Sequence, residues 1–129
     1  IVSEANHAAD DCCPIHVVQL GPMPAFESPR HAIPHEGTEV TGLRHRRWTV
    51  SAARFELDEL YGSFFICMRD EPELDFGGRR QPDGRGFAAF GRVVGGFQAV
   101  EAAYALAETT ELLARPIPIT SIAVMETAG

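Results

Sequence analysis

Short apolar runs separated by turn residues dominate the chain. They lie at residues 15–20, 49–55, 63–68, 87–94 and 117–125. Gly21-Pro22 follows the first run and Gly95-Gly96 follows the fourth. Runs of this length with turn residues between them are typical of antiparallel β-strands. The pattern therefore predicts a mainly β fold of about five strands, and an open sheet of that kind has unpaired edges that need covering.

Residues 97–113 differ from these runs. They are rich in Ala, Glu and Leu, which favour a helix. Their apolar residues recur at spacings of three and four, which places them on one face of a helix. These residues are Phe97, Val100, Tyr104 and Ala107, with Glu101 and Glu108 on the other face. Pro116 is expected to end this helix, since proline cannot continue one.

Two stretches read as loops. The first carries Pro22, Pro24, Pro29 and Pro34, and the second is the polar stretch 69–86, which is rich in Gly, Asp and Arg. Proline and glycine clusters of this kind favour extended or turning backbone. Neither loop reads as a linker between domains, so residues 1–129 are expected to form a single domain.

Charge and composition narrow the classes of partner. The 129 residues carry a formal charge of −7, which disfavours binding to phosphate backbones. The basic run 44–48 with its tryptophan could stack on nucleic acid, but a solvated loop entering a strand is the favoured interpretation, so we expect no nucleic-acid partner. No apolar run is long enough to span a bilayer, and no membrane partner is expected.

The cysteines and other possible ligands predict neither a disulfide framework nor a metal site. Three cysteines, Cys12, Cys13 and Cys67, lack the spacing of a framework, so free thiols and a cytoplasmic location are expected. No charged and apolar leader follows Ile1. The ligand types near Cys12, which are Asp10, Asp11, Cys13 and His16, lack zinc-site spacing. Pro34 separates His31 from His35, so we expect no metal and no cofactor.

A series of ordered motifs resembles one protein family. Residues 62–67 read Gly-Ser-Phe-Phe-Ile-Cys, and residues 90–96 read Phe-Gly-Arg-Val-Val-Gly-Gly. Further matches lie at residues 15–21, 33–36, 41–45, 49–54, 73–78 and 82–84. In this order they resemble the second half of the cyclophilin-type peptidyl-prolyl cis-trans isomerases, in their bacterial branch, over residues 15–124.

The resemblance implies a fold, which in this family is an eight-stranded antiparallel β-barrel capped by two helices. Relative to that pattern, the first two strands and the first helix have no counterpart in this sequence. We therefore expect an incomplete cyclophilin-like barrel with one or two helices. A homodimer that pairs or exchanges edges would be an economical way to cover the exposed core.

The resemblance also implies a peptide-binding site. Phe65 matches the central aromatic residue of the family's proline pocket, and Leu74 matches its leucine wall. Phe87 stands where the family has His or Tyr, Gln19 matches the glutamine that grips the peptide backbone, and Ala53 matches a small residue beside the groove. The alternative is that Phe65 and Leu74 are plain core residues, as apolar strand residues usually are.

The family's chemistry depends on an arginine near the proline nitrogen. Rotation about an X-Pro bond is slow because amide resonance must be broken, and a donor that bonds the deconjugated nitrogen favours the twisted state. The family spacing reaches Asp11, or a position before Ile1, so no catalytic arginine is identified. We expect a proline-peptide-binding protein with weak or absent isomerase activity. The alternatives are an active isomerase using Arg54, Arg85 or a neighbouring chain, and a structural module that oligomerises.

Overall fold

The computed structural model of the chain describes residues 1–9, 11–22 and 28–126. The expectations for Asp10 as a possible ligand and for Pro24 in the proline-rich loop fall outside the described residues.

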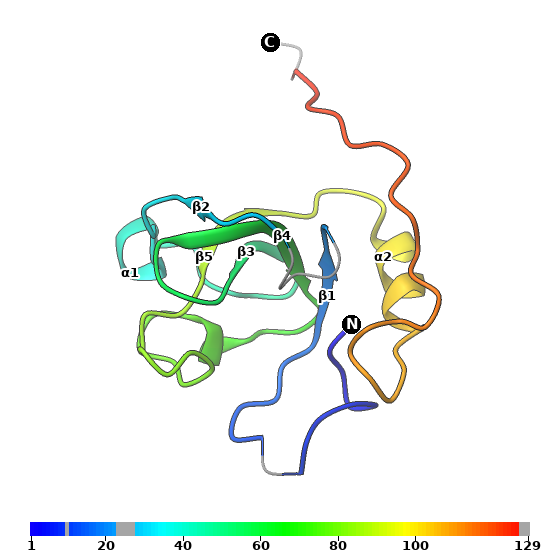
Figure 1. The fold of residues 1–129 in the computed structure, drawn as a ribbon, viewed down its shortest axis with the longest axis horizontal. Helices are drawn as coiled ribbons and strands as arrows, with labels where there is room; N and C mark the ends of the chain where they lie inside the picture. The colour runs from blue at the N-terminus through cyan, green and yellow to red at the C-terminus, as the bar shows by residue number, and fades with distance from the viewer. Residues whose placement is uncertain (10, 23–27, 127–129) are drawn as a thin grey trace.

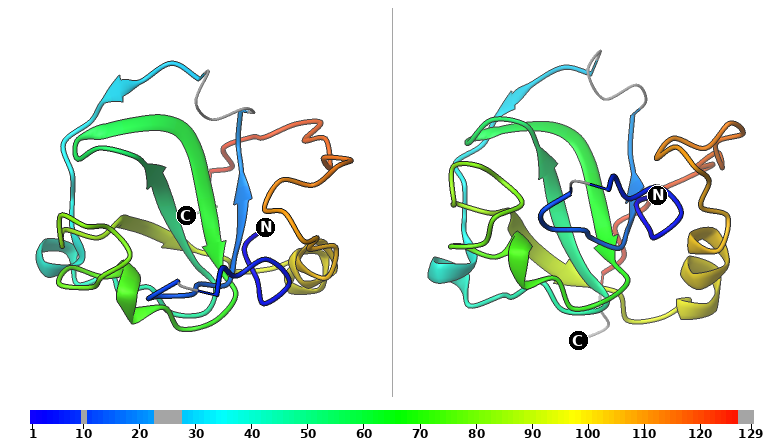
Figure 2. Two further views of the ribbon diagram at one scale, coloured as in Figure 1. Left: turned by 60° about the horizontal axis from the view of Figure 1, so that its bottom comes forward. Right: turned by 90° about the horizontal axis from the view of Figure 1, so that it is seen from below.

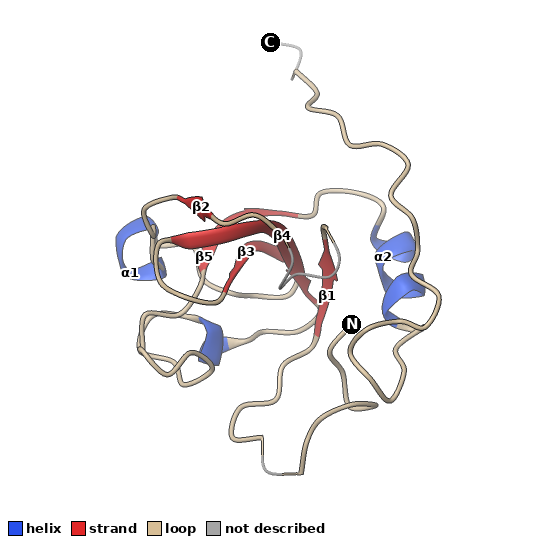
Figure 3. Cartoon of the chain, in the orientation of Figure 1, coloured by secondary structure: helices blue, strands red, loops and turns tan. Residues whose placement is uncertain are grey.

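Five antiparallel strands form one sheet (Figures 1 and 3). The order across the sheet is β1-β4-β3-β5, and β2 pairs with the far end of β4. The strands are β1 (Val17–Leu20), β2 (His31–Ala32), β3 (Thr49–Arg54), β4 (Glu59–Cys67) and β5 (Ala88–Arg92). The predicted mainly β, antiparallel class is confirmed, and within the described residues the strands do not close into a barrel.

Four of the five predicted strands are present, and the fifth prediction is wrong. Strand β4 begins at Glu59, four residues before the predicted start at Ser63, because His31–Ala32 pairs with Leu60 and Glu59 and extends it. Residues 117–125 form no strand, and their side chains are exposed. An extended segment needs a partner for its backbone groups, and none of the described strands pairs with this one.

The helical prediction is correct in place and wrong in length. Helix α2 spans only Phe97–Tyr104, so Ala107 and Glu108 lie beyond it and Pro116 does not end it. The β-branched pair Thr109-Thr110 follows soon after, and such residues favour helices weakly. Two further short helices, α1 (Thr38–Thr41) and the 3₁₀ helix η2 (Pro72–Leu74), were not predicted. No helix in the described part of the chain is both long and apolar enough to cross a bilayer.

The two faces of the sheet carry different apolar clusters, because neighbouring strand residues point to opposite faces. One cluster, here called the loop-covered cluster, comprises Val2, Ile15, Val17, Ala53, Tyr61, Phe65, Cys67 and Leu74, with Phe87 packed against it. The other, the helix-covered cluster, comprises Val18, Ile66 and Met68, with Leu20, Trp48, Val50, Val93, Val100 and Tyr104 packed against it. Figure 2 shows the sheet curved, with α1 and α2 at opposite ends.

The β5 side of the sheet leaves apolar residues open to solvent. Strand β5 stands last in the strand order, and among the described strands it pairs only with β3. Phe90 on β5 is 60% exposed, and Val94 just beyond it is 79% exposed. After α2 the chain turns back to the N-terminal segment, where Ile1 donates to the Glu111 carbonyl at 2.7 Å, and its end then runs away from the sheet in Figure 1.

The N-terminal segment corrects the expectation of free thiols at residues 12 and 13. Cys12 and Cys13 are joined by a disulfide, which their adjacent places on a bend allow. The Asp11 carboxylate accepts the backbone N–H of Cys13 at 3.0 Å and pairs with Arg80 at 2.9 Å. This hydrogen bond to Cys13 is the main cause that lowers the pKa of Asp11. Further along, Val2 forms an antiparallel bridge with Val17.

Candidate functional site

The candidate site is built on one face of β4. Tyr61, Ser63, Phe65 and Cys67 occupy alternate positions of this strand and so share a face. Gln19 of β1 lies directly opposite Phe65 in the antiparallel register. The alternation brings an aromatic ring, a phenol, a hydroxyl and an amide to neighbouring positions.

The long polar loop covers this face and adds two apolar side chains to it. Leu74 on η2 is 0% exposed, and the half-buried Phe87 ring meets Phe65 edge-on at 5.4 Å between centroids. The backbone N–H of Phe87 donates to the Leu74 carbonyl at 2.9 Å, which ties the two ends of the loop together. Gly86 has φ +65° and passes close to the Leu74 carbonyl oxygen, so the loop closes where only glycine fits.

The side chain of Arg54 fixes the C-terminal end of the loop. This side chain is 1% exposed, and its Nε and Nη2 atoms donate to the Gly86 carbonyl at 2.9 and 2.6 Å. Nη2 also donates to Asp83 at 3.0 Å, and this hydrogen bond is the main cause that lowers the pKa of Asp83. The Arg54 guanidinium lies 5.5 Å from the centre of the Phe87 ring. A buried cation with several acceptors therefore holds Phe87 in place.

His45 fixes the other end of the loop. Its ring lies stacked on Phe65 at 6.1 Å, with Nδ1 2.8 Å from Asp75 Oδ1 and Nε2 2.8 Å from Ser51 Oγ. The Asp75 carboxylate also accepts the backbone N–H of His45 at 2.9 Å. Burial lowers the pKa of His45, so the ring is neutral at pH 7, and its partners assign the proton to Nδ1.

Ser51, His45 and Asp75 are linked by hydrogen bonds in the same series as the serine, histidine and aspartate of a hydrolytic triad. However, Ser51 is 0% exposed. No substrate carbonyl can reach a hydroxyl in that position. Cys67 is equally buried, and burial raises the pKa of its thiol. Both groups are therefore structural, and neither gives the site a nucleophile. In residues 1–9, 11–22 and 28–126, no three acidic, cysteine or histidine side chains form a group that could hold a metal.

The structure brings four of the five predicted site residues into one cluster. Ala53, Phe65 and Leu74 are buried in the loop-covered cluster, and Phe87 packs against it. The fifth, Gln19, is exposed beside them, and its amide donates to the Tyr61 hydroxyl at 2.9 Å. The accessible residues of this site are therefore Gln19, which is exposed, and Phe87, which is half-buried.

Sequence reasoning missed the residues that support the site. The sequence places His45 in a basic run and a family motif, and Arg54 in another motif and as a substitute catalytic arginine, but it does not indicate that either residue supports the site. Tyr61 was not considered, although it stands four residues before Phe65 and so falls on the same face of the strand. The alternation within β4 could have indicated Tyr61. The partners of His45 and Arg54 lie 30 and 32 residues away in sequence, and no local pattern indicates them.

The basic run enters β3 and contributes to the interior as well as the surface. His45 is buried, as described above, whereas Arg47 is exposed and pairs with Glu101 at 2.8 Å. The Arg47 guanidinium also lies 4.9 Å from the centre of the Trp48 ring. Both arginine contacts are made within the chain, and Glu101 comes from the exposed face of α2.

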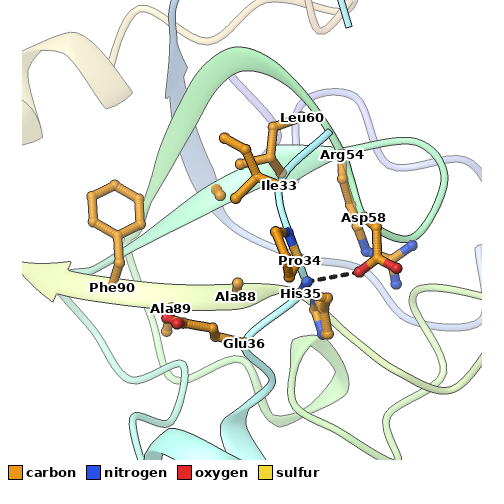
Figure 4. Close-up of a pocket in the computed structure, with 11 residues that line it drawn as sticks. Ile33, Pro34, His35, Glu36, Arg54, Asp58, Leu60, Ala88, Ala89 and Phe90 are labelled. Carbon is orange, nitrogen blue, oxygen red and sulfur yellow. Dashed lines mark hydrogen bonds between the residues drawn. The ribbon is translucent and has the colours of Figure 1, made fainter. Parts of the chain in front are cut away.

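A hollow of about 360 Å³ lies elsewhere, between β3, β5 and the segment after β2 (Figure 4). Its lining is mostly apolar and includes Ile33, Pro34, Ala52, Leu60 and Phe90. None of the five predicted site residues lines it. Ala52 lines the hollow, whereas its neighbour Ala53 belongs to the loop-covered cluster. The hollow and the predicted site thus share none of the five predicted residues, but Arg54 lines the hollow and also contacts Phe87.

Comparison with known proteins places the chain in a family. The model of the family "Cyclophilin type peptidyl-prolyl cis-trans isomerase/CLD" matches residues 12–124. A search of curated proteins finds no match. The matched region contains β1 to β5, η2 and α2, and thus every element that builds the loop-covered cluster except the bridge at Val2. The chain belongs to the cyclophilin-type peptidyl-prolyl cis-trans isomerase family.

Proposed function

We propose that the chain binds proline-containing peptides at the loop-covered cluster and has weak or absent isomerase activity. The observation that carries this proposal is the convergence of Phe65, Leu74 and Phe87 in a chain of this family. A pyrrolidine ring is apolar and favours contact with such side chains. Phe87 offers the accessible ring, and Gln19 offers an amide for the peptide backbone beside it.

Low activity is proposed because the arginine in this cluster is already committed. Speeding rotation about an X-Pro bond requires a donor that bonds the nitrogen more strongly in the twisted state. Arg54 lies beside Phe87, but its donors bond Gly86, Asp83 and the Phe55 carbonyl. Turning it toward a peptide would leave the buried Gly86 carbonyl unpaired, which costs about 1 to 3 kcal/mol, and would break its pairing with the exposed Asp83 carboxylate.

Calorimetric titration with a proline-containing tetrapeptide tests the binding proposal. We expect saturable binding that Phe87→Ala weakens at least fivefold. Phe90→Ala is the matched control, because Phe90 is an exposed phenylalanine on β5 outside the loop-covered cluster. Equal loss in both variants, or no binding by the wild-type protein, would contradict the proposal. A protease-coupled isomerisation assay on the same samples tests the activity, and a rate far above the spontaneous one would refute its absence.

The position of Arg54 favours a second candidate, an active isomerase with a substitute arginine. Its guanidinium is 5.5 Å from the centre of the Phe87 ring, which is within reach of a proline bound there. If the coupled assay shows turnover, Arg54→Lys should reduce kcat more than peptide affinity, while Arg85→Lys serves as an exposed comparison. Loss in neither variant would reject both arginines and leave one from a neighbouring chain as the remaining source.

A homodimer is also proposed, on the basis of the open β5 side of the sheet. Unpaired strand edges beside exposed apolar residues favour association with a second chain. Light scattering at low micromolar concentration should give twice the mass of one chain. Val94→Glu should shift the protein toward monomer, and Val40→Glu should not, because Val40 is 77% exposed but lies on α1, away from this edge. A monomer in the wild-type sample would contradict the dimer.

A further inference from the structure

We propose that the Tyr61 hydroxyl is the hydrogen-bond donor that grips the backbone carbonyl of a bound proline peptide, with Gln19 as its positioning residue. This inference rests on the proposed peptide binding and adds a specific polar contact to it. The ligand class is an extended peptide whose proline lies against Phe87 and whose flanking carbonyl meets Tyr61.

The hydrogen bond between Gln19 and Tyr61 determines what the phenol can do. The Gln19 amide donates to Tyr61 Oη at 2.9 Å, so this bond uses an oxygen lone pair and not the phenolic proton. The proton is left for an acceptor other than Gln19. A phenol that accepts one bond is also a better donor in the next, because hydrogen bonds in a chain polarise one another.

The Tyr61 ring is held in place before any ligand arrives. It stacks on Phe55 at 4.7 Å with an angle of 22° between the planes. The Arg30 guanidinium lies 4.6 Å from the Phe55 ring centre and 5.5 Å from that of Tyr61. A fixed ring loses little rotational freedom when its hydroxyl bonds a ligand, so the contact adds affinity with a small entropic cost.

The register places this hydroxyl next to the apolar part of the site. Gln19 lies directly opposite Phe65, and Tyr61 Oη is within hydrogen-bond distance of the Gln19 side chain. The phenol therefore leans along β4 toward Phe65 and Phe87. Residues of an extended peptide are about 3.3 Å apart, so a carbonyl one or two residues from the proline comes within its reach.

A second hydroxyl on the same face, that of Ser63, is buried beside the site. Among the described residues, Ser63 Oγ is the one buried side-chain polar atom without a hydrogen-bond partner. It stands between Tyr61 and Phe65 in the alternation of β4. Gly21 packs directly against Ser63 Oγ, so this hydroxyl is covered by the end of β1 and takes no part in the proposed contact.

Tyrosine-selective ¹³C NMR tests the inference directly, because the chain has two tyrosines. A saturating proline peptide should shift the ring signals of Tyr61 and leave those of Tyr104, which lies on α2, unchanged. By calorimetry, Tyr61→Phe should weaken binding about fivefold to tenfold. Tyr104→Phe, which also loses one hydroxyl, should bind like the wild-type protein.

The outcomes separate this inference from the binding proposal. Wild-type binding without a Tyr61 shift, or equal affinity of Tyr61→Phe, overturns the inference and leaves peptide binding intact. A wild-type protein that binds no peptide overturns both. The NMR measurement uses the unaltered chain, so it decides the matter even if Tyr61→Phe does not fold.

Discussion

The two faces of the sheet are covered in different ways. On the loop-covered face, buried polar side chains fix the cover: Arg54 bonds the Gly86 carbonyl, and His45 bonds Asp75. On the opposite face, α2 packs Val100 and Tyr104 against the cluster, yet none of its residues is fully buried. One face is therefore fixed by directional hydrogen bonds and the other mainly by apolar contact.

This difference suggests where function resides. Apolar contact is non-directional and tolerates small displacements, whereas several hydrogen bonds to buried carbonyls and carboxylates define one arrangement. A binding site needs its side chains held in a defined geometry. The loop-covered face has that construction, and the helix-covered face does not.

The largest effect should come from adding one methyl group where the loop closes. Gly86→Ala introduces strain at φ +65° and a Cβ about 2.5 Å from the Leu74 carbonyl oxygen, so we expect a loss of about 4 kcal/mol. Gly84→Ala shares the positive φ, +69°, but has open space around its Cβ, and should cost about 1 kcal/mol. Urea unfolding measures both. Equal losses would mean that the loop is not fixed against Leu74.

Truncating one apolar side chain on each face gives the next largest difference. Leu74→Ala removes a fully buried side chain and should cost about 3 kcal/mol, because a fixed loop cannot collapse into the cavity. Val100→Ala on the helix-covered side should cost about 1 kcal/mol, since that site is partly exposed and α2 can shift. Thermal unfolding of both variants compares them. A larger loss for Val100→Ala would reverse our comparison of the faces.

The sequence predicted the strands of the sheet better than the loop and the helix that cover its two faces. Strands β3 and β4 follow from short apolar runs with turn residues between the runs, and the structure pairs the two strands antiparallel. The segment 117–125 has the same apolar pattern but no described strand beside it, so the pattern alone could not decide its structure. Helix α2 ends at Tyr104 although the apolar periodicity continues to Ala107, because periodicity does not reveal the tertiary contacts that override local propensity.

In the candidate site, too, some residues could be predicted from the sequence and others could not. Phe65, Leu74 and Phe87 could be assigned together because the family's order of motifs places them. Their supports could not, since Arg54 and Gly86 meet only after the loop folds back. The Ser51 hydroxyl and His45 ring are close in sequence, yet their bond depends on Asp75 orienting the imidazole.

A smaller effect should follow from removing the imidazole that supports the loop. His45→Asn leaves Ser51 and Asp75 without their shared partner and should cost about 2 kcal/mol. It should also change the ring-current shifts of Phe65, because the two rings are stacked. Denaturant unfolding and NMR of the aromatic region measure the two effects. His31→Asn on the exposed strand β2 is the control and should cost less than about 0.5 kcal/mol.

The smallest effect should be a pH dependence confined to the loop-covered face. Burial lowers the pKa of His45 below its ordinary value of 6.5 in the folded state. The unfolded chain therefore binds more protons just below that pH, and stability falls as the pH falls. The contribution is fully present above about pH 6.5 and is lost below it. Unfolding curves collected between about pH 7.5 and pH 5 should show this decline.

The variant His45→Asn identifies the source of that decline, because it has no titrating group at this position. Its stability should vary less than that of the wild-type protein over the same range. The carboxylates with lowered pKa, which are Glu4, Asp11 and Asp83, also contribute stability that acid removes, but only as the pH falls through their ordinary pKa values of 4.5 for Glu and 3.8 for Asp and below. Equal slopes for the two proteins above about pH 5 would show that the imidazole is not the sensitive group. The polar supports of the loop-covered face would then be indifferent to pH, like the apolar contacts opposite.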